Sequence, residues 1–159
     1  MKYFSTYIIV LIFLFSCNNS SVTVNQDKLL SADLSGDINF KFSSSKVYYI
    51  LFETGEVEIY SEQLINPNEI LTINIKFLYQ NGLTKFNLSN LQNRTFFEKR
   101  NFINTIKKYD ENVTGDIEVI SLTKNSIEAN FRFTAEKKDT LSNQIYKINI
   151  SNGKIIFKS

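Results

Sequence analysis

Histidine and tryptophan are absent from this chain, and cysteine, proline and methionine occur once each. The absence of histidine excludes Ser-His-Asp triads, Cys-His dyads and histidine metal sites. A single cysteine excludes an intrachain disulfide, a zinc ribbon and an iron–sulfur cluster. The chain also lacks a large excess of charge of either sign, because 18 Lys and Arg residues are balanced by 16 Asp and Glu residues. Nucleic-acid-binding proteins usually carry a clustered basic patch, so we expect no nucleic-acid partner.

The remaining composition is typical of a globular domain. The chain has 159 residues, of which 43% are hydrophobic and 21% charged. A domain of about 150 residues buries roughly 70% of the surface of its unfolded chain. The length therefore predicts a single domain with a sizeable core.

The first 16 residues have the pattern of an export signal. Lys2 supplies a positive charge, and an unbroken apolar run extends from Tyr7 to Phe15. Nine helical residues rise only ~14 Å, whereas the hydrocarbon core of a membrane is ~30 Å thick. The run is therefore short for a transmembrane helix, and we predict that residues 1–16 are a signal peptide.

The end of this run, Leu14-Phe15-Ser16-Cys17, resembles a bacterial lipobox. The resemblance implies transfer of a diacylglyceryl group to the Cys17 sulfur, cleavage before Cys17, and acylation of the new amino terminus by a fatty acid such as palmitate. Two or three acyl chains, at ~0.8 kcal/mol per buried CH₂, hold a protein stably on a membrane. We expect Cys17 to be the membrane anchor and the polar residues 17–30 to be a lipidated tether.

From residue 31 to residue 159 the sequence predicts an antiparallel all-β domain. Apolar and polar residues alternate with period two, most regularly at Leu71, Ile73, Ile75 and Phe77. We expect about eight strands in a β-sandwich or a barrel-like arrangement. The continuous apolar run 47–52 predicts a strand covered on both faces. The residues from 83 to 109 favour strand and loop, with a helical turn as the alternative.

The C-terminal third ends in two further strand patterns and a turn signal. Ile127 to Ala135 form one strand pattern, and Asn152-Gly153 predicts a type I′ turn between two short strands. Together with residues 115–119, this region resembles small uncharacterised lipoproteins of Bacteroidota, which are domains of unknown function. The resemblance covers about residues 115–157 and implies an exported all-β domain with no catalytic residues to carry over. In such bacteria, surface-exposed lipoproteins often carry acidic residues just after the cysteine. The first acidic residue here is Asp27, so we expect attachment to the outer membrane on its periplasmic side.

Three sets of residues are candidates for a site. Tyr48 and Tyr60 become ligand-facing if they share an exposed face of one hairpin. Glu56 and Glu58 lie ~7 Å apart on one strand face, near the spacing that glycosidases use. The triplet Asp139-Thr140-Leu141 resembles a periplasmic O-glycosylation motif, which makes Thr140 a possible glycosylation site.

These observations favour a lipid-anchored protein of the cell envelope. We expect a non-enzymatic β-domain that binds or scaffolds an envelope protein or a glycan, with no catalytic residue, metal ligand or cofactor. A hydrolase that acts on a glycan with a carboxylate pair is one alternative. An inhibitor or immunity-type protein that blocks a partner enzyme is another.

Overall fold

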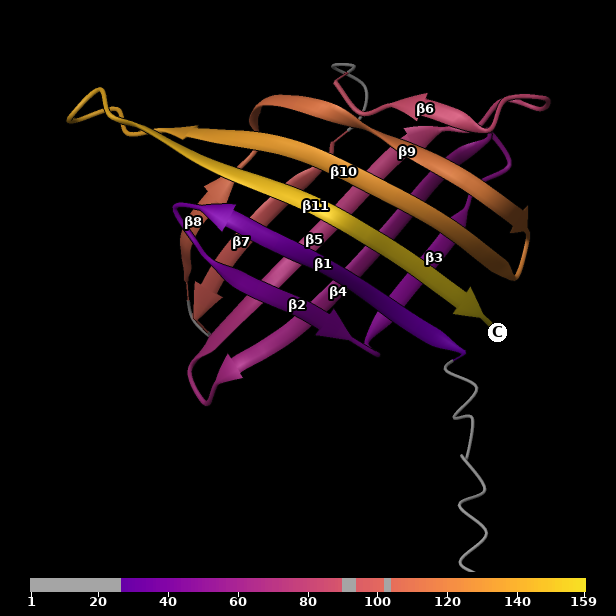
Figure 1. Cartoon of the computed structure of the whole chain (residues 1–159), viewed down its shortest axis with the longest axis horizontal. Helices are drawn as coiled ribbons and strands as arrows, with labels where there is room; N and C mark the ends of the chain where they lie inside the picture. The colour runs from indigo at the N-terminus through magenta and orange to yellow at the C-terminus, as the bar shows by residue number, and fades with distance from the viewer. Residues whose placement is uncertain (1–26, 90–93, 102–103) are drawn as a thin grey trace, which may run out of the picture.

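The computed structural model describes residues 27–89, 94–101 and 104–159, and these residues form strands connected by turns (Figure 1). Within them there are eleven strands and no helix, which confirms the all-β prediction and exceeds the expected count of about eight. In chain order the strands are β1 (Lys28–Gly36), β2 (Phe40–Ser44), β3 (Val47–Leu51), β4 (Glu56–Asn66), β5 (Glu69–Leu78), β6 (Lys85–Asn87), β7 (Phe96–Asn101), β8 (Thr105–Tyr109), β9 (Glu111–Thr123), β10 (Ser126–Lys138) and β11 (Ile145–Lys158).

The strands form two separate sheets, as the sandwich alternative of the prediction requires. One sheet has six strands in the order β2-β1-β11-β10-β9-β6, and the other has five in the order β3-β4-β5-β7-β8. Neighbouring strands pair antiparallel in both sheets. Figure 1 shows the six-stranded sheet in front and the five-stranded sheet behind it, with the two sets of strands crossing.

The core lies between the two sheets and is made by the inward-facing residues of the long strands. Leu71, Ile73, Ile75 and Phe77 are all buried, as their alternation predicts. Ile127, Ala129, Phe131 and Phe133 of β10 form a matching buried row from the opposite sheet. Complete burial of one large aliphatic side chain contributes about 1.5–3 kcal/mol, so these rows account for much of the stability of the domain.

The strand β5 is buried on both faces, which the alternation alone did not predict. Thr72 and Asn74 face away from the core but are 0% and 3% exposed. The register places Asn74 opposite Tyr60 of β4 on one side and Phe96 of β7 on the other. Because β5 is the central strand of its sheet, side chains of both neighbouring strands cover its outer residues.

The prediction of a strand at residues 47–52 was confirmed, but the expectation that both of its faces are covered was wrong. These residues form the edge strand β3 and its end, and their burial alternates instead of being continuous. Val47 is buried in the core, whereas Tyr48 is 57% exposed and Ile50 is 50% exposed. A run of apolar residues predicts a strand, but it does not say whether another layer covers the second face.

The predicted turn at Asn152-Gly153 was also wrong. The strand β11 runs unbroken from Ile145 to Lys158, and Asn152 adopts a φ of 50° within it. Both neighbouring strands shift register here, so the residue forms a β-bulge. The residue after the bulge, Gly153, has no room for a side chain because the Phe131 ring packs against it. A Cβ at this position would lie 2.6 Å from Phe131 Cδ1.

The structure assigns one segment that the sequence left open and moves one expected boundary. The described residues between 83 and 109 form the short strands β6, β7 and β8, without a helical turn. The strand β1 begins at Lys28, inside the range expected for the tether. Cys17 and the predicted signal peptide lie outside the described residues. No helix among the described residues is long and apolar enough to cross a membrane.

Candidate binding face of the five-stranded sheet

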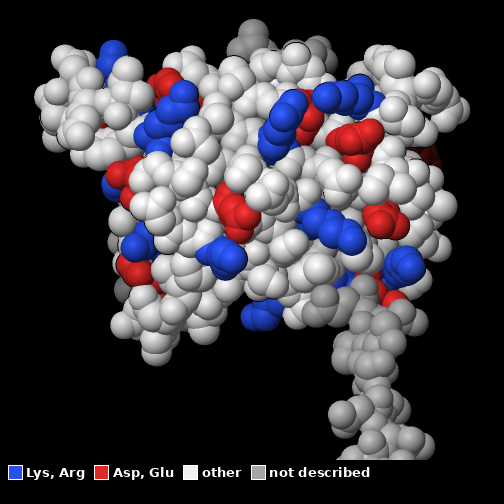
Figure 2. All heavy atoms as spheres, in the orientation of Figure 1, with Lys and Arg blue, Asp and Glu red and all other residues white. Residues whose placement is uncertain are grey.

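The outer faces of the two sheets differ in chemistry. Figure 2 shows the face of the six-stranded sheet with Lys, Arg, Asp and Glu of both signs spread across it. Arg132 of β10 pairs with Asp116 of β9 at 3.2 Å on this side, and Lys41, Lys147 and Lys154 are exposed. Such a face is well hydrated, and its scattered charges form no patch of one sign.

The five-stranded sheet collects the exposed hydrophobic residues. Ten large hydrophobic residues of the described chain are exposed, and six of them lie in or next to the strands of this sheet. They are Tyr48, Ile50, Phe52, Leu64, Leu78 and Ile106. Isolated exposed hydrophobic residues are common in folded proteins, but their concentration on one sheet makes this face the candidate binding surface.

Tyr48 of the edge strand β3 and Tyr60 of its neighbour β4 lie side by side on this face. They are directly paired between β3 and β4, with ring centroids 6.0 Å apart and ring planes tilted by 50°. Tyr48 is 57% exposed and Tyr60 is partly buried. The structure therefore brings the two predicted residues together on one exposed face. Their role toward a ligand remains a prediction.

The register extends this pair into a row across four strands. Tyr48 lies opposite Tyr60, Tyr60 opposite Asn74, and Asn74 opposite Phe96. Since neighbouring strands lie ~4.8 Å apart, the row is about 14 Å long. We refer to Tyr48, Tyr60, Asn74 and Phe96 as the aromatic row.

Tyr60 is fixed in place by a polar cluster next to the row. Its hydroxyl donates a hydrogen bond to Glu62, and Arg100 of β7 forms an ion pair with the same carboxylate. The Arg100 guanidinium also lies 3.4 Å from the Tyr60 hydroxyl. Burial, and then the hydrogen bond to Glu62, raise the pKa of Tyr60. The phenol is thus neutral at physiological pH, and its ring orientation is determined by the cluster.

The buried polar atoms without a hydrogen-bond partner also lie on this face. Among the described residues they are Thr72 Oγ1, Asn74 Oδ1 and Arg100 Nε. Asn74 donates through Nδ2 to the Arg94 carbonyl at 3.1 Å, which leaves its carbonyl oxygen as an unused acceptor. The Thr72 hydroxyl lies close enough to Tyr60 to lower the pKa of that phenol. Asn74 Oδ1 and Arg100 Nε are therefore the clearer examples of buried atoms without a partner. Buried polar groups without a hydrogen-bond partner cost free energy and are rare in native proteins. Asn74 and Arg100 are therefore candidates for contact with a ligand.

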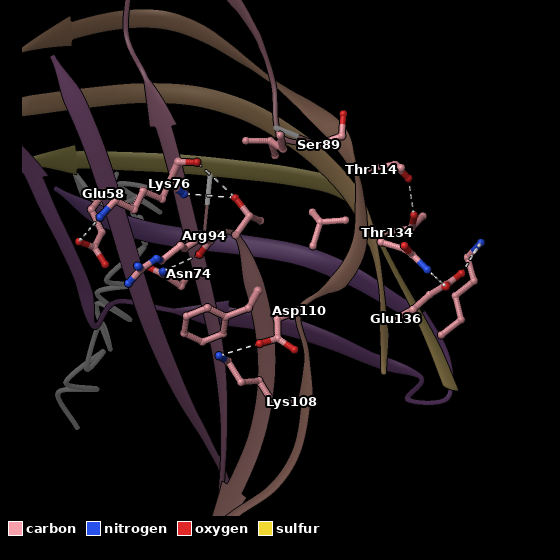
Figure 3. Close-up of a pocket in the computed structure, with 16 residues that line it drawn as sticks. Glu58, Asn74, Lys76, Ser89, Arg94, Lys108, Asp110, Thr114, Thr134 and Glu136 are labelled. Carbon is pink, nitrogen blue, oxygen red and sulfur yellow. Dashed lines mark hydrogen bonds and ion pairs between the residues drawn. The ribbon is translucent and has the colours of Figure 1, made fainter. Parts of the chain in front are cut away.

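The aromatic row leads into a pocket of about 1270 Å³. Asn74 and Phe96 line it, together with residues of the six-stranded sheet such as Thr114 and Thr134. Figure 3 shows Glu58, Asn74 and Lys76 on one side and Thr114, Thr134 and Glu136 on the other. The acidic groups of the pocket are paired with lysines: Glu58 with Lys76 at 3.9 Å, Asp110 with Lys108 at 2.8 Å, and Glu136 with Lys147 at 3.9 Å.

Glu56 and Glu58, the candidate carboxylate pair, both lie against one lysine. The Lys76 ammonium forms an ion pair with each of them. A glycosidase needs one carboxyl group that holds a proton. That this pair acts on a glycan remains a prediction. No group of three or more Asp, Glu or Cys side chains suited to a metal ion occurs in the described part of the chain.

Thr140 lies at the tip of the loop between β10 and β11. It is exposed, and its neighbour Leu141 is 96% exposed. The Asp139 carboxylate accepts hydrogen bonds from the amides of Leu141 at 2.8 Å and Ser142 at 3.1 Å, and these bonds lower the pKa of Asp139. Asp139 therefore shapes the turn that presents the Thr140 hydroxyl, whose modification remains a prediction.

The sequence pattern missed Asn74, Phe96 and Arg100 as site residues. Asn74 occupies a polar position of the most regular strand, where an exposed asparagine is the ordinary expectation. Only the order of β4, β5 and β7 and their register bring these residues beside Tyr60. Strand order does not follow from the alternation of a single strand, so no local signal marks them.

No protein-family model, curated protein sequence or solved structure matches the chain. The resemblance of residues 115–157 to Bacteroidota lipoproteins therefore remains a prediction.

Proposed function

We propose that the protein is a lipid-anchored, non-enzymatic binding domain of the bacterial cell envelope, and that the outer face of its five-stranded sheet is the binding face. The anchor is Cys17, in the lipobox-like sequence at residues 14–17. The observation that carries the binding face is the difference between the two sheets. Six of the ten exposed large hydrophobic residues of the described chain lie in or next to the strands of the five-stranded sheet, beside its ion pairs, while the face of the other sheet carries scattered charges.

Three features support binding over catalysis. The chain contains no histidine, and its candidate carboxylates Glu56 and Glu58 both contact Lys76. Tyr60 is held by Glu62 and Arg100, which gives a rigid surface with little conformational entropy to lose when a partner binds. A rigid exposed face of aromatic and aliphatic residues suits recognition of a partner.

An affinity capture with matched variants tests this proposal. Tagged, lipidated protein is recovered from gently cross-linked native membranes, both as wild type and with Tyr48→Ser and Ile50→Ser combined. The control combines Ile120→Ser and Ile145→Ser in the six-stranded sheet, because those residues are equally exposed, at 57% and 59%. We expect the captured material to be lost from the first variant and retained by the control. Equal capture by all three proteins would contradict the assignment of the face.

A further inference from the structure

The proposed function does not specify which class of molecule binds along the aromatic row. The row presents the rings of Tyr48, Tyr60 and Phe96, and the nearly buried Asn74 amide lies between the last two in the wall of the adjoining pocket. Aromatic rings offer flat, weakly polar surfaces that pack against the C–H faces of a ligand. The alternation of ring and amide along ~14 Å suits an elongated ligand with both apolar faces and polar groups.

The charges around the row argue against a charged ligand. On this face and in the adjoining pocket, five cations stand against six acids, an excess of one acid; the cations are Lys76, Arg94, Arg100, Lys108 and Lys147, and the acids are Glu56, Glu58, Glu62, Glu98, Asp110 and Glu136. Four of the five cations are already in ion pairs with these acids. A phosphate or polyanion would have to displace those pairs, and a polycation would meet the same lysines and arginines. The electrostatics therefore favour a neutral ligand.

The unused hydrogen-bonding groups indicate what that neutral ligand must supply. Asn74 is 3% exposed, lines the pocket, and keeps its Oδ1 atom as a free acceptor. Arg100 keeps its Nε–H as a free donor beside Tyr60. Leaving such groups without partners costs free energy in the empty protein, and a ligand that supplies O–H or N–H donors and oxygen acceptors recovers it. The paired carboxylates Glu58 and Glu62 flank the row and can accept hydrogen bonds from hydroxyl groups.

We infer that the aromatic row binds a neutral oligosaccharide. The sugar rings lie over Tyr48 and Tyr60, and the chain continues past Asn74 and Phe96 into the pocket of about 1270 Å³. A hydroxyl or an acetamido N–H of the sugar donates to Asn74 Oδ1. This inference rests on the proposed binding face and adds the class of ligand to it.

The test uses neutral trisaccharides as probes and the full lipidated protein in detergent micelles. Triacetylchitotriose supplies acetamido groups, and maltotriose supplies hydroxyl groups alone. Binding is followed by calorimetry and by tyrosine fluorescence, which is clean because the chain has no tryptophan. We expect at least one probe to bind the wild type. Tyr48→Ala should weaken binding about tenfold, while Tyr48→Phe should bind like the wild type because the ring is kept.

Ile120→Ala is the matched control, since Ile120 and Tyr48 are both 57% exposed but lie in different sheets. The Tyr48 side chain makes no hydrogen bond within the described residues, so its truncation should leave the fold intact, and a thermal melt of each variant verifies this. Binding that Tyr48→Ala leaves unchanged would overturn the location of the site.

Absence of binding by both trisaccharides at millimolar concentration would overturn the inference of a glycan. It would leave the binding face itself standing if the membrane capture still depends on Tyr48 and Ile50, and the occupant would then be a protein. If neither trisaccharide binds and the membrane capture does not depend on Tyr48 and Ile50 either, the proposed function is overturned.

Discussion

The contact between Asp37 and Tyr109 gives the sharpest prediction about stability. Tyr109 of β8 is fully buried, and its hydroxyl donates a hydrogen bond to the Asp37 carboxylate in the loop after β1. Lys107 of β8 pairs with the same carboxylate at 2.7 Å, and the Asp37 amide donates to the Lys147 carbonyl at 3.0 Å. The cluster therefore ties the edge strand of the five-stranded sheet to the six-stranded sheet.

Tyr109→Phe removes one hydrogen bond to a charged acceptor and keeps the ring. Such bonds contribute about 1.5–3 kcal/mol, and the lower end applies because the Asp37 side chain is 23% exposed and keeps Lys107. We expect a loss of about 1.5 kcal/mol in the free energy of unfolding, which lowers the melting temperature by about 3–6 °C in a domain of this size. Urea unfolding at pH 7 measures the loss.

The effect should depend on pH in a defined direction. Burial alone raises the pKa of Asp37, but hydrogen bonds from Lys107 and Tyr109 outweigh it and place the pKa below 3.8. A carboxylate whose pKa is lowered by folding stabilises the protein above its unfolded pKa, and this stability is lost as pH falls through the folded pKa. The penalty of Tyr109→Phe should therefore be full at pH 6 and shrink below pH 3.8.

Tyr146→Phe is the matched control, because among the described residues the Tyr146 hydroxyl bonds the exposed Gln144 side chain alone, at 3.0 Å. That variant should change the free energy of unfolding by less than about 0.5 kcal/mol. A Tyr109→Phe penalty no larger than that of Tyr146→Phe, or one that is unchanged at pH 3, would refute the argument.

The remaining predictions concern packing, the anchor and the loop tip. Gly153→Ala places a Cβ 2.6 Å from the Phe131 ring and 2.5 Å from the Phe131 carbonyl oxygen, so it should destabilise the domain by at least about 1–3 kcal/mol in urea unfolding. Ile73→Ala, in the core, should cost about 2–5 kcal/mol, whereas Ile50→Ala, half exposed, should cost under about 1 kcal/mol; similar losses would contradict the assigned faces of the two strands. Cys17→Ala should leave the far-UV circular dichroism unchanged and move the protein from the detergent phase to the aqueous phase, and retention in the detergent phase would rule out Cys17 as the anchor. Intact-mass measurement of protein from its native host should show a glycan mass that Thr140→Ala removes; an unmodified mass would end that hypothesis.

The sequence predicted the parts of the fold that depend on local alternation. Leu71 to Phe77 and Ile127 to Phe133 follow strict period two, and each row is buried as expected. Errors arose where a local signal has two structural outcomes. Asn152-Gly153 favours a positive φ, which serves a bulge as well as a turn, and residues 47–52 are apolar although one face is open.

The candidate site was predictable only in part, for the same reason. Tyr48 and Tyr60 belong to one hairpin, so the short connection between β3 and β4 was enough to place them together. Asn74 and Phe96 join them through the pairing of β5 with β7, across a connection that includes β6 of the other sheet. Pairings across such a distance in sequence depend on the packing of the whole domain.

The central claim is that a partner in the envelope meets the five-stranded sheet and not the six-stranded one. A photo-cross-linking amino acid placed at Ile50 or at Ile120, in otherwise native protein in living cells, tests it directly. The two positions are 50% and 57% exposed, so they are similarly accessible to the solvent. We predict a discrete cross-linked product or glycan adduct from position 50 and none from position 120. Cross-linking from position 120 alone would contradict the account.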